Sequence, residues 1–238
     1  MKHTKVNDCV ECNKCDSRKI SVFSVLPPEK IDELMSSKSI LVFYYGELIF
    51  KEGQYPSGIY ILNKGKVKIS KYGYEGREQI VRFAREGDVL GYRTLLSADR
   101  YACSASAIEE SHVCYISSEV FFKLVREFPE LSLKFMNLLA IDLKNAEEKA
   151  MRMAQKTVRE RVAESILILK EIYGFEEDGT TLNINLKRDE IAGIAGTVRE
   201  TATRFLSELN ESHIISLSGK KIRILDMKKL IRSANVFE

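Results

Sequence analysis

Hydrophobic residues between positions 39 and 117 fall in short runs that glycines separate. The runs are rich in isoleucine, leucine, valine, phenylalanine and tyrosine, which favour β-strands. They cover residues 40–45, 48–50, 58–62, 66–72, 79–84 and 111–116. Short strands at this spacing, with glycine at the turns, are typical of a β-sandwich or β-roll.

The pattern becomes helical between residues 118 and 155, where no glycine occurs. One apolar stripe, the seam, recurs at alternating spacings of three and four residues, as in a coiled coil. It consists of Met136, Leu139, Leu143, Ala146, Ala150 and Met153. A second stripe consists of Leu131, Phe135 and Leu138. Because two apolar faces need two partners, we expect the second stripe to pack on the β-roll and the seam to form a dimer interface. A helix buried within one chain is the alternative.

The last third of the chain combines helices with a hairpin. The pattern predicts helices at 158–173, 188–195 and 197–210, with breaks at Gly174 and Gly196 and a short strand at 182–186. Two β-rich runs, 214–217 and 222–225, flank a turn that contains Gly219. Helix, glycine-containing turn, helix and hairpin in this order outline a winged helix-turn-helix.

The first 20 residues show little periodicity and are expected to form an arm, and Pro27-Pro28 then suits a helix start. The patterns divide the chain into a cysteine-rich arm (1–20), a β-roll sensor domain (21–125), a dimerisation helix (126–155) and a winged helix-turn-helix domain (156–238).

Composition narrows the class of protein. Of 238 residues, 30% are charged and 45% hydrophobic, as in globular proteins. No apolar run approaches the roughly 18 residues of a membrane span, and the N-terminus lacks the apolar core of a secretory signal. We therefore expect a cytoplasmic protein with no membrane partner. A net charge of +3 does not by itself indicate a nucleic-acid partner.

The predicted helix at 197–210 carries side chains suited to reading bases. Arg199, Glu200, Thr203 and Arg204 share one face, and apolar residues supply the opposite face. Arginine can bond guanine bidentately in the major groove, and glutamate can accept from cytosine. The alternative is a capping box formed by Thr197 and Glu200, with solvated arginines beyond it.

Local charge supports this reading. Between residues 187 and 232 there are ten basic and six acidic residues, so the excess there is larger than that of the whole chain. Candidate phosphate contacts are Lys187, Arg188, Lys220 and Lys221. Such contacts set register rather than sequence, and each residue could equally be a solvated surface charge.

Cysteine usage suggests a metal. The chain has five cysteines, three of which, Cys9, Cys12 and Cys15, fall within seven residues. An odd, clustered set in a reducing compartment is not typical of a disulfide framework. Three thiolates could hold an iron–sulfur cluster with a fourth, or zinc with a ligand such as His3. A redox-reactive arm without metal is the third alternative.

Three motifs carry a family resemblance over nearly the whole chain. They are Gly46-Glu47-Leu48-Ile49-Phe50 with Tyr60-Ile61-Leu62-Asn63-Lys64-Gly65-Lys66-Val67, Glu86-Gly87-Asp88-Val89-Leu90-Gly91, and Arg199-Glu200-Thr201-Ala202-Thr203-Arg204. With them the chain resembles the bacterial cyclic-AMP receptor protein and fumarate-nitrate reductase regulator (CRP/FNR) family of transcription factors.

The resemblance implies an α+β fold: an N-terminal double-stranded β-helix of the cyclic-nucleotide-binding type, a long dimerisation helix and a C-terminal winged helix-turn-helix. It also implies a homodimer that binds palindromic promoter DNA and contacts RNA polymerase. Glu200 and Arg204 match the family's shared base-contacting positions. Arg199 matches an arginine of the cyclic-AMP branch, and Thr203 stands where the oxygen-sensing branch has a serine, so a TGTGA-like half-site is expected.

The resemblance also bears on the sensed signal. The cyclic-nucleotide branch holds its ligand with a Gly-Glu pair and an Arg-Ser, where this chain has Gly91-Tyr92 and Asp99-Arg100-Tyr101-Ala102. Cyclic nucleotide binding is therefore not expected. The segment around Cys114 looks like the stretch that bears the distant cluster ligand of the oxygen-sensing branch, which implies a [4Fe-4S] cluster on Cys9, Cys12, Cys15 and Cys114. The third arm cysteine is closer here than in the usual pattern.

Alternatives remain at this point. Cys103 and Cys114 could be small buried residues, and the regulator could be metal-free and gated by another effector in the β-roll or by thiol oxidation. An enzyme is not expected, because the chain has no nucleophile elbow, no phosphate-binding glycine loop and only three histidines. A stand-alone ligand-binding module would explain the β-roll but would leave residues 156–238 without a role.

Overall fold

The computed structural model describes residues 15–31, 38–73 and 75–236. These residues form two compact units. One comprises the described residues up to Lys71 together with Arg82–Asn145, and the other comprises Tyr72–Val81 and the described residues from Ala146 onward. No helix in this part of the chain is long and apolar enough to cross a membrane.

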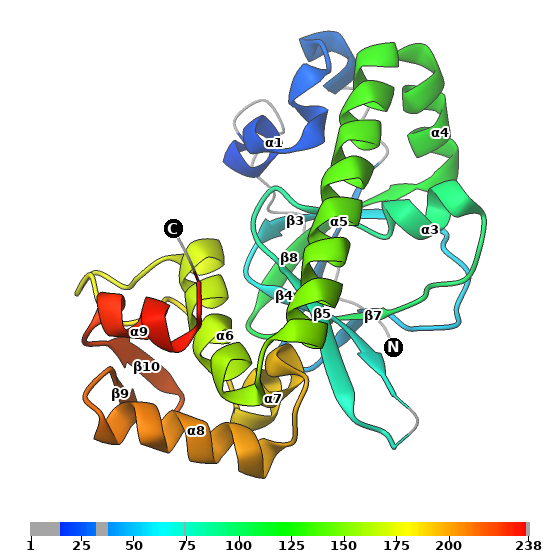
Figure 1. Ribbon diagram of the computed structural model, residues 1–238. Helices are drawn as coiled ribbons and strands as arrows, with labels where there is room; N and C mark the ends of the chain where they lie inside the picture. The colour runs from blue at the N-terminus through cyan, green and yellow to red at the C-terminus, as the bar shows by residue number, and fades with distance from the viewer. Residues whose placement is uncertain (1–14, 32–37, 74, 237–238) are drawn as a thin grey trace. The chain divides into compact units, whose positions relative to one another are not determined.

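Two four-stranded sheets form the β-roll, as predicted (Figure 1). The first has the order β1 (Ser39–Phe43), β8 (Ser111–Ser117), β3 (Gly58–Lys64) and β6 (Val89–Leu90). The second has the order β2 (Leu48–Phe50), β7 (Ser104–Ala107), β4 (Val67–Tyr72) and β5 (Glu78–Ala84). The sequence pattern predicted six of these strands and missed β6 and β7.

Glycine is required at the tight turn between β3 and β4. Gly65 has a φ of +97°, and a Cβ there would stand 2.5 Å from the carbonyl oxygen of Glu110. Only a residue without a side chain accepts both the left-handed backbone and this approach. The turn therefore fixes how the two sheets are joined.

Helices cover one face of the first sheet. They are α1 (Asp16–Ile20), the short 3-10 helix η2 (Val22–Val25), α3 (Tyr92–Ser97), α4 (Ser118–Glu127) and the long α5 (Pro129–Gln155), and residues 28–31 are also helical, beginning at Pro28 as predicted. Phe135 is the centre of this core: its ring lies 6.0 Å from that of Phe23, 5.5 Å from Tyr92 and 5.2 Å from Phe121. Leu131 is fully buried and Leu138 packs against the same core, so the second stripe does pack on the β-roll.

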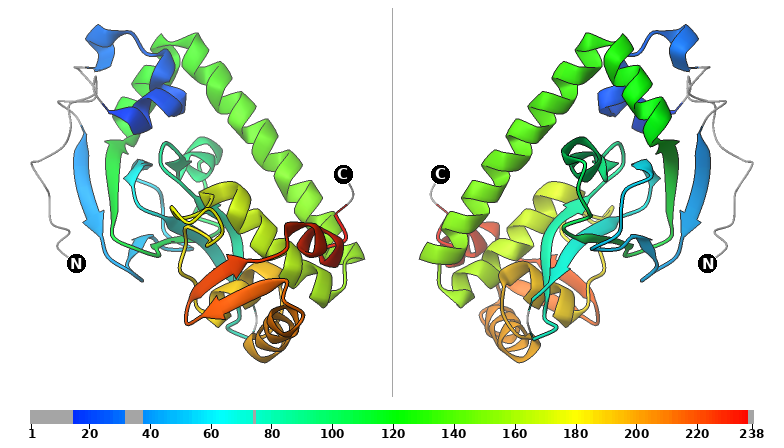
Figure 2. Two further views of the ribbon diagram at one scale, coloured as in Figure 1. Left: turned by 90° about the vertical axis from the view of Figure 1, so that its left-hand side faces the viewer. Right: turned by 90° about the vertical axis from the view of Figure 1, so that its right-hand side faces the viewer.

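The second unit is built around α6 (Val158–Tyr173), which contacts three further helices. They are α7 (Arg188–Ala195), α8 (Arg199–Glu211) and α9 (Met227–Ser233), and the hairpin consists of β9 (Ile215–Ser218) and β10 (Lys221–Ile224). Figure 2 shows the hairpin beside α8. The helix-turn-helix prediction is confirmed.

The predicted strand at 182–186 was wrong. Around it the structure has only isolated bridges, between Phe175 and Leu182 and between Thr181 and Arg223. Leu182, Ile184 and Leu186 are nevertheless buried in alternation with exposed residues. The alternation of apolar and polar residues therefore reflects side chains that are buried and exposed in turn, in a segment that does not pair as a strand.

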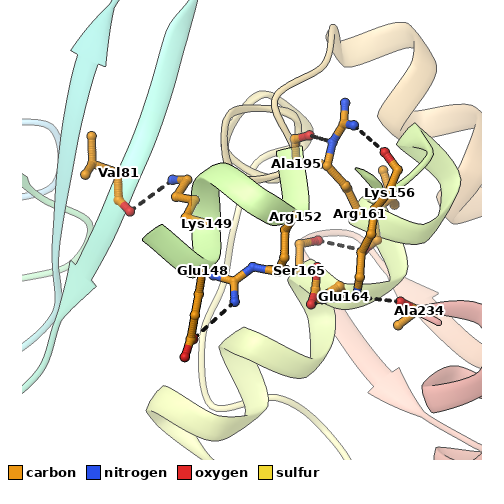
Figure 3. Close-up of polar contacts among 11 residues, drawn as sticks. Val81, Glu148, Lys149, Arg152, Lys156, Arg161, Glu164, Ser165, Ala195 and Ala234 are labelled. Atoms are coloured by element: carbon orange, nitrogen blue, oxygen red, sulfur yellow. Dashed lines mark hydrogen bonds and ion pairs between the residues drawn. The ribbon is translucent and has the colours of Figure 1, made fainter. Parts of the chain in front are cut away.

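A network of polar contacts joins the end of α5 to the other elements of the second unit (Figure 3). Lys156 Nζ lies 2.8 Å from Glu164 Oε1 and donates to the carbonyl oxygen of Ala234 at 2.9 Å. Arg161 donates through Nε to the carbonyl oxygen of Ala195 at 2.7 Å and through Nη1 to that of Lys156 at 2.7 Å. Arg161 thus links α6 to the end of α7. Lys156 links the end of α5 to α6 and to Ala234, the residue that follows α9.

Residues of β5 also belong to the second unit. Lys149 on α5 donates to the carbonyl oxygen of Val81 at 3.0 Å (Figure 3), and Gln79 donates to that of Gly193 on α7 at 2.6 Å. A Cβ at Gly193 would lie 3.0 Å from the carbonyl oxygen of Glu78, so the strand and α7 approach closely at a glycine.

Candidate functional site

Helix α8, here called the reader helix, has one exposed and one buried face. Its buried residues are Ala202, Leu206 and Leu209. The side chains predicted to read bases, Arg199, Glu200, Thr203 and Arg204, are all exposed. The periodicity of the sequence therefore predicted correctly which face of this helix is presented to solvent.

The predicted capping box at the start of the reader helix does not form. The helix begins at Arg199 with Val198 as its N-cap, and no side chain caps it. Thr197 lies one residue outside the cap position that the box requires. The alternative reading of Thr197 and Glu200 is therefore wrong, and Glu200 stands in the first turn of the helix.

Neighbouring side chains contact both arginines of the reader helix. Arg199 Nη1 lies 3.7 Å from Asp189 Oδ2 on α7, and both side chains are about 60% exposed (62% and 59%). The guanidinium of Arg204 stacks over the ring of Phe205 at 4.8 Å from its centroid. Exposed contacts of this kind are weak, so both guanidinium groups can exchange them for a base or phosphate at little cost.

The four predicted phosphate contacts lie at the start of α7 and in the β9–β10 turn. Lys187, Lys220 and Lys221 are exposed, and Lys221 pairs with Glu176 at 2.7 Å. Arg188 is partly buried and donates through Nη2 to the carbonyl oxygen of Gly219 at 3.2 Å. Its buried Nη1 has no hydrogen-bond partner in the described residues, and burial lowers the pKa of this guanidinium. Arg188 thus stabilises the β9–β10 turn through its bond to Gly219. The side chains of Lys187, Lys220 and Lys221 remain exposed to solvent.

The seam on α5 is largely uncovered. Met136 is 58% exposed and Leu143 is 62% exposed, although both are large and apolar. Ala146 and Ala150 are exposed and Leu139 and Met153 are half-buried. Exposed apolar side chains gathered along one helix face mark an interaction surface.

Two of the predicted cluster ligands lie on or beside strands of the first sheet. Cys15 precedes α1 and Cys114 lies on β8, and each is only 8% exposed. Cys114 is paired with Ile61 on β3, and the side chain of Asn63, two residues further along β3, contacts the Cys15 sulfur. The pairing of β3 with β8 shifts register between Leu62 and Lys64, so the alternation along β3 is interrupted at Asn63.

The remaining arm ligands cannot be placed. Cys9, Cys12 and His3 fall outside the described residues, and within the described part no three His, Cys, Asp or Glu side chains form a metal-binding group. Cys103 precedes β7 in the other sheet, where burial raises its pKa. No pattern in the sequence singles out Asn63, whose side chain contacts Cys15 in the structure.

Aromatic side chains fill the interior of the β-roll near Gly91. The ring of Tyr101 stacks on that of Phe50 at 4.0 Å between centroids, and the rings of Tyr60 and Tyr115 lie 5.3 Å apart. A Cβ at Gly91 would lie 3.2 Å from the hydroxyl oxygen of Tyr101. That hydroxyl is buried without a hydrogen-bond partner in the described part of the chain, and burial raises its pKa.

Arg100, the residue before Tyr101, lies at the surface. Arg100 is exposed, donates to the carbonyl oxygen of Gly53 at 3.1 Å and stacks over the Tyr55 ring at 4.2 Å. Both contacts keep the guanidinium of Arg100 outside the interior of the β-roll.

A polar cavity of about 110 Å³ lies between the arm, β6 and α5. Tyr92 donates to Asp142 Oδ2 at 2.6 Å across it, and burial together with that bond raises the pKa of the phenol. Asp88 also lines the cavity, and burial raises the pKa of its carboxyl. These acidic groups were not predicted from the sequence, because residues 88 and 142 are far apart along the chain.

Comparison with known families covers both units. A family model described as the cyclic nucleotide-binding domain matches residues 40–128, and one described as the Crp-like helix-turn-helix domain matches residues 160–233. The two matches coincide with the β-roll and the helix-turn-helix of the structure.

Similar proteins are transcription regulators. The chain is 27% identical to the fumarate and nitrate reduction regulatory protein of Vibrio cholerae, over 95% of this chain and 91% of that protein. It is 31% identical to the nitrogen fixation regulation protein FixK of Azorhizobium caulinodans, over 80% of this chain and 77% of that protein. The structure of FixK2 from Bradyrhizobium japonicum superposes with a TM-score of 0.74 at 25% identity, covering 84% of this chain and 99% of that one.

Proposed function

The chain belongs to the CRP/FNR family of transcriptional regulators, and from that premise we propose that it is a homodimeric regulator that reads palindromic promoter DNA and senses oxygen, redox state or nitric oxide through an iron–sulfur cluster. The proposal has three parts: the DNA contact, the dimer and the sensor. The exposed polar face of the reader helix is the observation that carries the DNA-binding function.

The chemistry of the reader helix suits guanine and cytosine. Arg199 and Arg204 are exposed donors that can bond guanine, and Glu200 in the first turn is an acceptor for the cytosine amino group. Lys220 and Lys221 at the β9–β10 turn are exposed, which supports a role as phosphate contacts. A TGTGA-like half-site fits this set of donors and acceptors.

The exposed seam on α5 supports the proposed dimer. Met136 and Leu143 lose water from large apolar surfaces if a second copy of α5 lies against them. A two-fold dimer presents two reader helices, which matches a palindromic site. Contact with RNA polymerase is part of the same proposal, since the resemblance implies it.

The thiols present fit an iron–sulfur cluster. Cys15 and Cys114 are soft ligands, lie on or beside neighbouring strands of the first sheet and are shielded from water. Cys9 and Cys12 precede Cys15 by a few residues and would supply the other two ligands. When bound, such a cluster supplies an iron centre that reacts with oxygen or nitric oxide.

Contacts within the chain would connect the cluster ligand Cys15 to the dimerisation helix. Cys15 precedes α1, whose residue Ile20 contacts Gly87, and the same cavity wall includes Leu138 of α5. A ligand bond at Cys15 therefore holds the arm beside the dimerisation helix. A coupling of about 1–3 kcal/mol between cluster and dimer is enough to switch occupancy of a DNA site.

Binding to a labelled palindrome tests the DNA contact. Arg199→Ala and Arg204→Ala should each weaken binding by about 1–3 kcal/mol, roughly 5- to 150-fold, if they contact bases. Arg232→Ala, an exposed arginine on α9, is the matched control and should bind as the wild type. If Arg199→Ala does not change the preference at the second base of the half-site, the TGTGA assignment is wrong.

Anaerobic purification tests the sensor. We expect a brown protein with about four iron and four sulfide per chain, and loss of both in Cys114→Ser. Cys103→Ser is the control and should keep them, since Cys103 stands directly before β7 of the other sheet. Zinc in place of iron would support the zinc alternative. A colourless, metal-free protein whose DNA binding is the same in air and nitrogen would refute the cluster and leave a thiol or a β-roll effector as the signal.

A further inference from the structure

A side-chain amide is directed at the sulfur of Cys15. Asn63 Nδ2 lies 3.1 Å from Cys15 Sγ, and the two residues are 48 positions apart in the chain. The contact is partly buried, and the cysteine itself is 8% exposed. An amide nitrogen can only donate, so the sulfur is the acceptor in this bond.

Further hydrogen bonds hold the main chain at and before Asn63. The hydroxyl of Ser17 donates to the carbonyl oxygen of Asn63 at 2.6 Å, which ties α1 to the same residue. The preceding residue, Leu62, accepts from the amide of Gly87 at 2.8 Å and donates to the carbonyl oxygen of Asp88 at 2.9 Å. These bonds anchor the main chain of β3 at this point, and the side-chain amide of Asn63 bonds the Cys15 sulfur.

A donor at this distance favours an electron-rich sulfur. A thiolate accepts a hydrogen bond better than a neutral thiol, because charge on the acceptor strengthens the bond. Hydrogen bonds to the sulfurs, together with burial, are among the factors that set the reduction potential of iron–sulfur clusters. Groups that orient metal ligands also affect affinity for the metal.

We propose that Asn63 is a positioning residue for the Cys15 ligand: its amide orients the sulfur and withdraws electron density from it, which raises the reduction potential of the bound cluster. This inference rests on the cluster that forms part of the proposed function. It assigns a role to a residue on β3 that is neither a ligand nor a DNA contact.

The test compares Asn63→Leu, which removes the donor at similar volume, with Asn63→Gln, which retains an amide. Ser17→Ala is the matched control, because it removes the neighbouring bond between the arm and β3 without changing the bond to the sulfur. Each full-length protein is purified anaerobically, and iron content, cluster midpoint potential and iron–thiolate Raman stretching frequencies are measured.

We expect Asn63→Leu to have a more negative midpoint potential and higher iron–thiolate stretching frequencies than the wild type, and Ser17→Ala to match the wild type in both. A wild type without iron would refute the proposed cluster. Iron in the wild type with an unchanged potential in Asn63→Leu would refute the role of Asn63 alone. If Asn63→Leu fails to load, loading of Asn63→Gln supports the role, and failure of both shows that Asn63 only packs.

Discussion

The ion pair between Lys156 and Glu164 should control the stability of the second unit. The side chains are 15% and 12% exposed, so the pair is shielded from water far more than a surface pair. Replacing Lys156 with methionine keeps most of the side-chain volume but removes the charge and the bond to the carbonyl oxygen of Ala234. Glu164 is then left with Arg152, whose Nε lies 3.9 Å away.

The size of the effect follows from these contacts. Removing one member of a buried pair costs about 3–5 kcal/mol when the other is left alone. Since Arg152 still faces Glu164, we expect about 2–3 kcal/mol, which includes the lost bond to Ala234. Glu164→Gln in the Lys156→Met background should then cost less than in the wild type, with a coupling of about 1–2 kcal/mol.

Hydrogen exchange is the appropriate assay, because the chain has no tryptophan and two compact units need not unfold together. Exchange of α6 and α9 amides should accelerate about 30- to 150-fold in Lys156→Met, since 1.4 kcal/mol is a factor of ten. Peptides from β3 and β8 serve as the internal reference. Acceleration below about threefold in α6, or equal acceleration in β8, would refute the reasoning.

Three further outcomes are expected. Leu143→Glu places a charge on the exposed seam and should convert the dimer to monomer in light scattering, with loss of palindrome binding; a dimer of unchanged mass would contradict the interface. Asp189→Asn releases Arg199 and should tighten DNA binding about two- to fivefold at low salt, with the gain disappearing at high salt, as measured by anisotropy titrations. Burial raises the folded pKa of Asp88 above its unfolded value, so ionisation destabilises the fold at neutral pH. Asp88→Asn should therefore have a higher Tm than the wild type at neutral pH, and the difference should vanish as the pH falls toward about 4; a constant difference would exclude ionisation as its cause.

Helix boundaries were the most predictable part of the fold. The ends of α6 and α7 were predicted to the residue, because Gly174 and Gly196 stand directly after them with positive φ. Strand β7 was missed because its sequence, Ser-Ala-Ser-Ala, has no β-strand signal. All four residues are buried between β2 and β4, so their small size reflects the space between strands rather than local preference.

Only those residues of the candidate site whose placement depends on the local sequence could be predicted. One turn of periodicity suffices to place Arg199 and Arg204 on the exposed face of a helix. The contact of Asn63 with Cys15 depends instead on where α1 meets β3, which no local pattern encodes. The same holds for the cavity that Asp88 and Asp142 share.

Helix α5 runs for 27 residues, about 40 Å, and contains neither glycine nor a proline after its first residue (Figure 2). Without a residue that introduces a kink, it should behave as a stiff lever. Its first turns are fixed by Leu131 and Phe135 in the core under the arm. A tilt of about 5° at that end would displace the other end of the helix by about 3.5 Å. Packing changes too small to alter the fold of the β-roll would therefore move the far seam residues of the helix, Ala150 and Met153, by a similar distance.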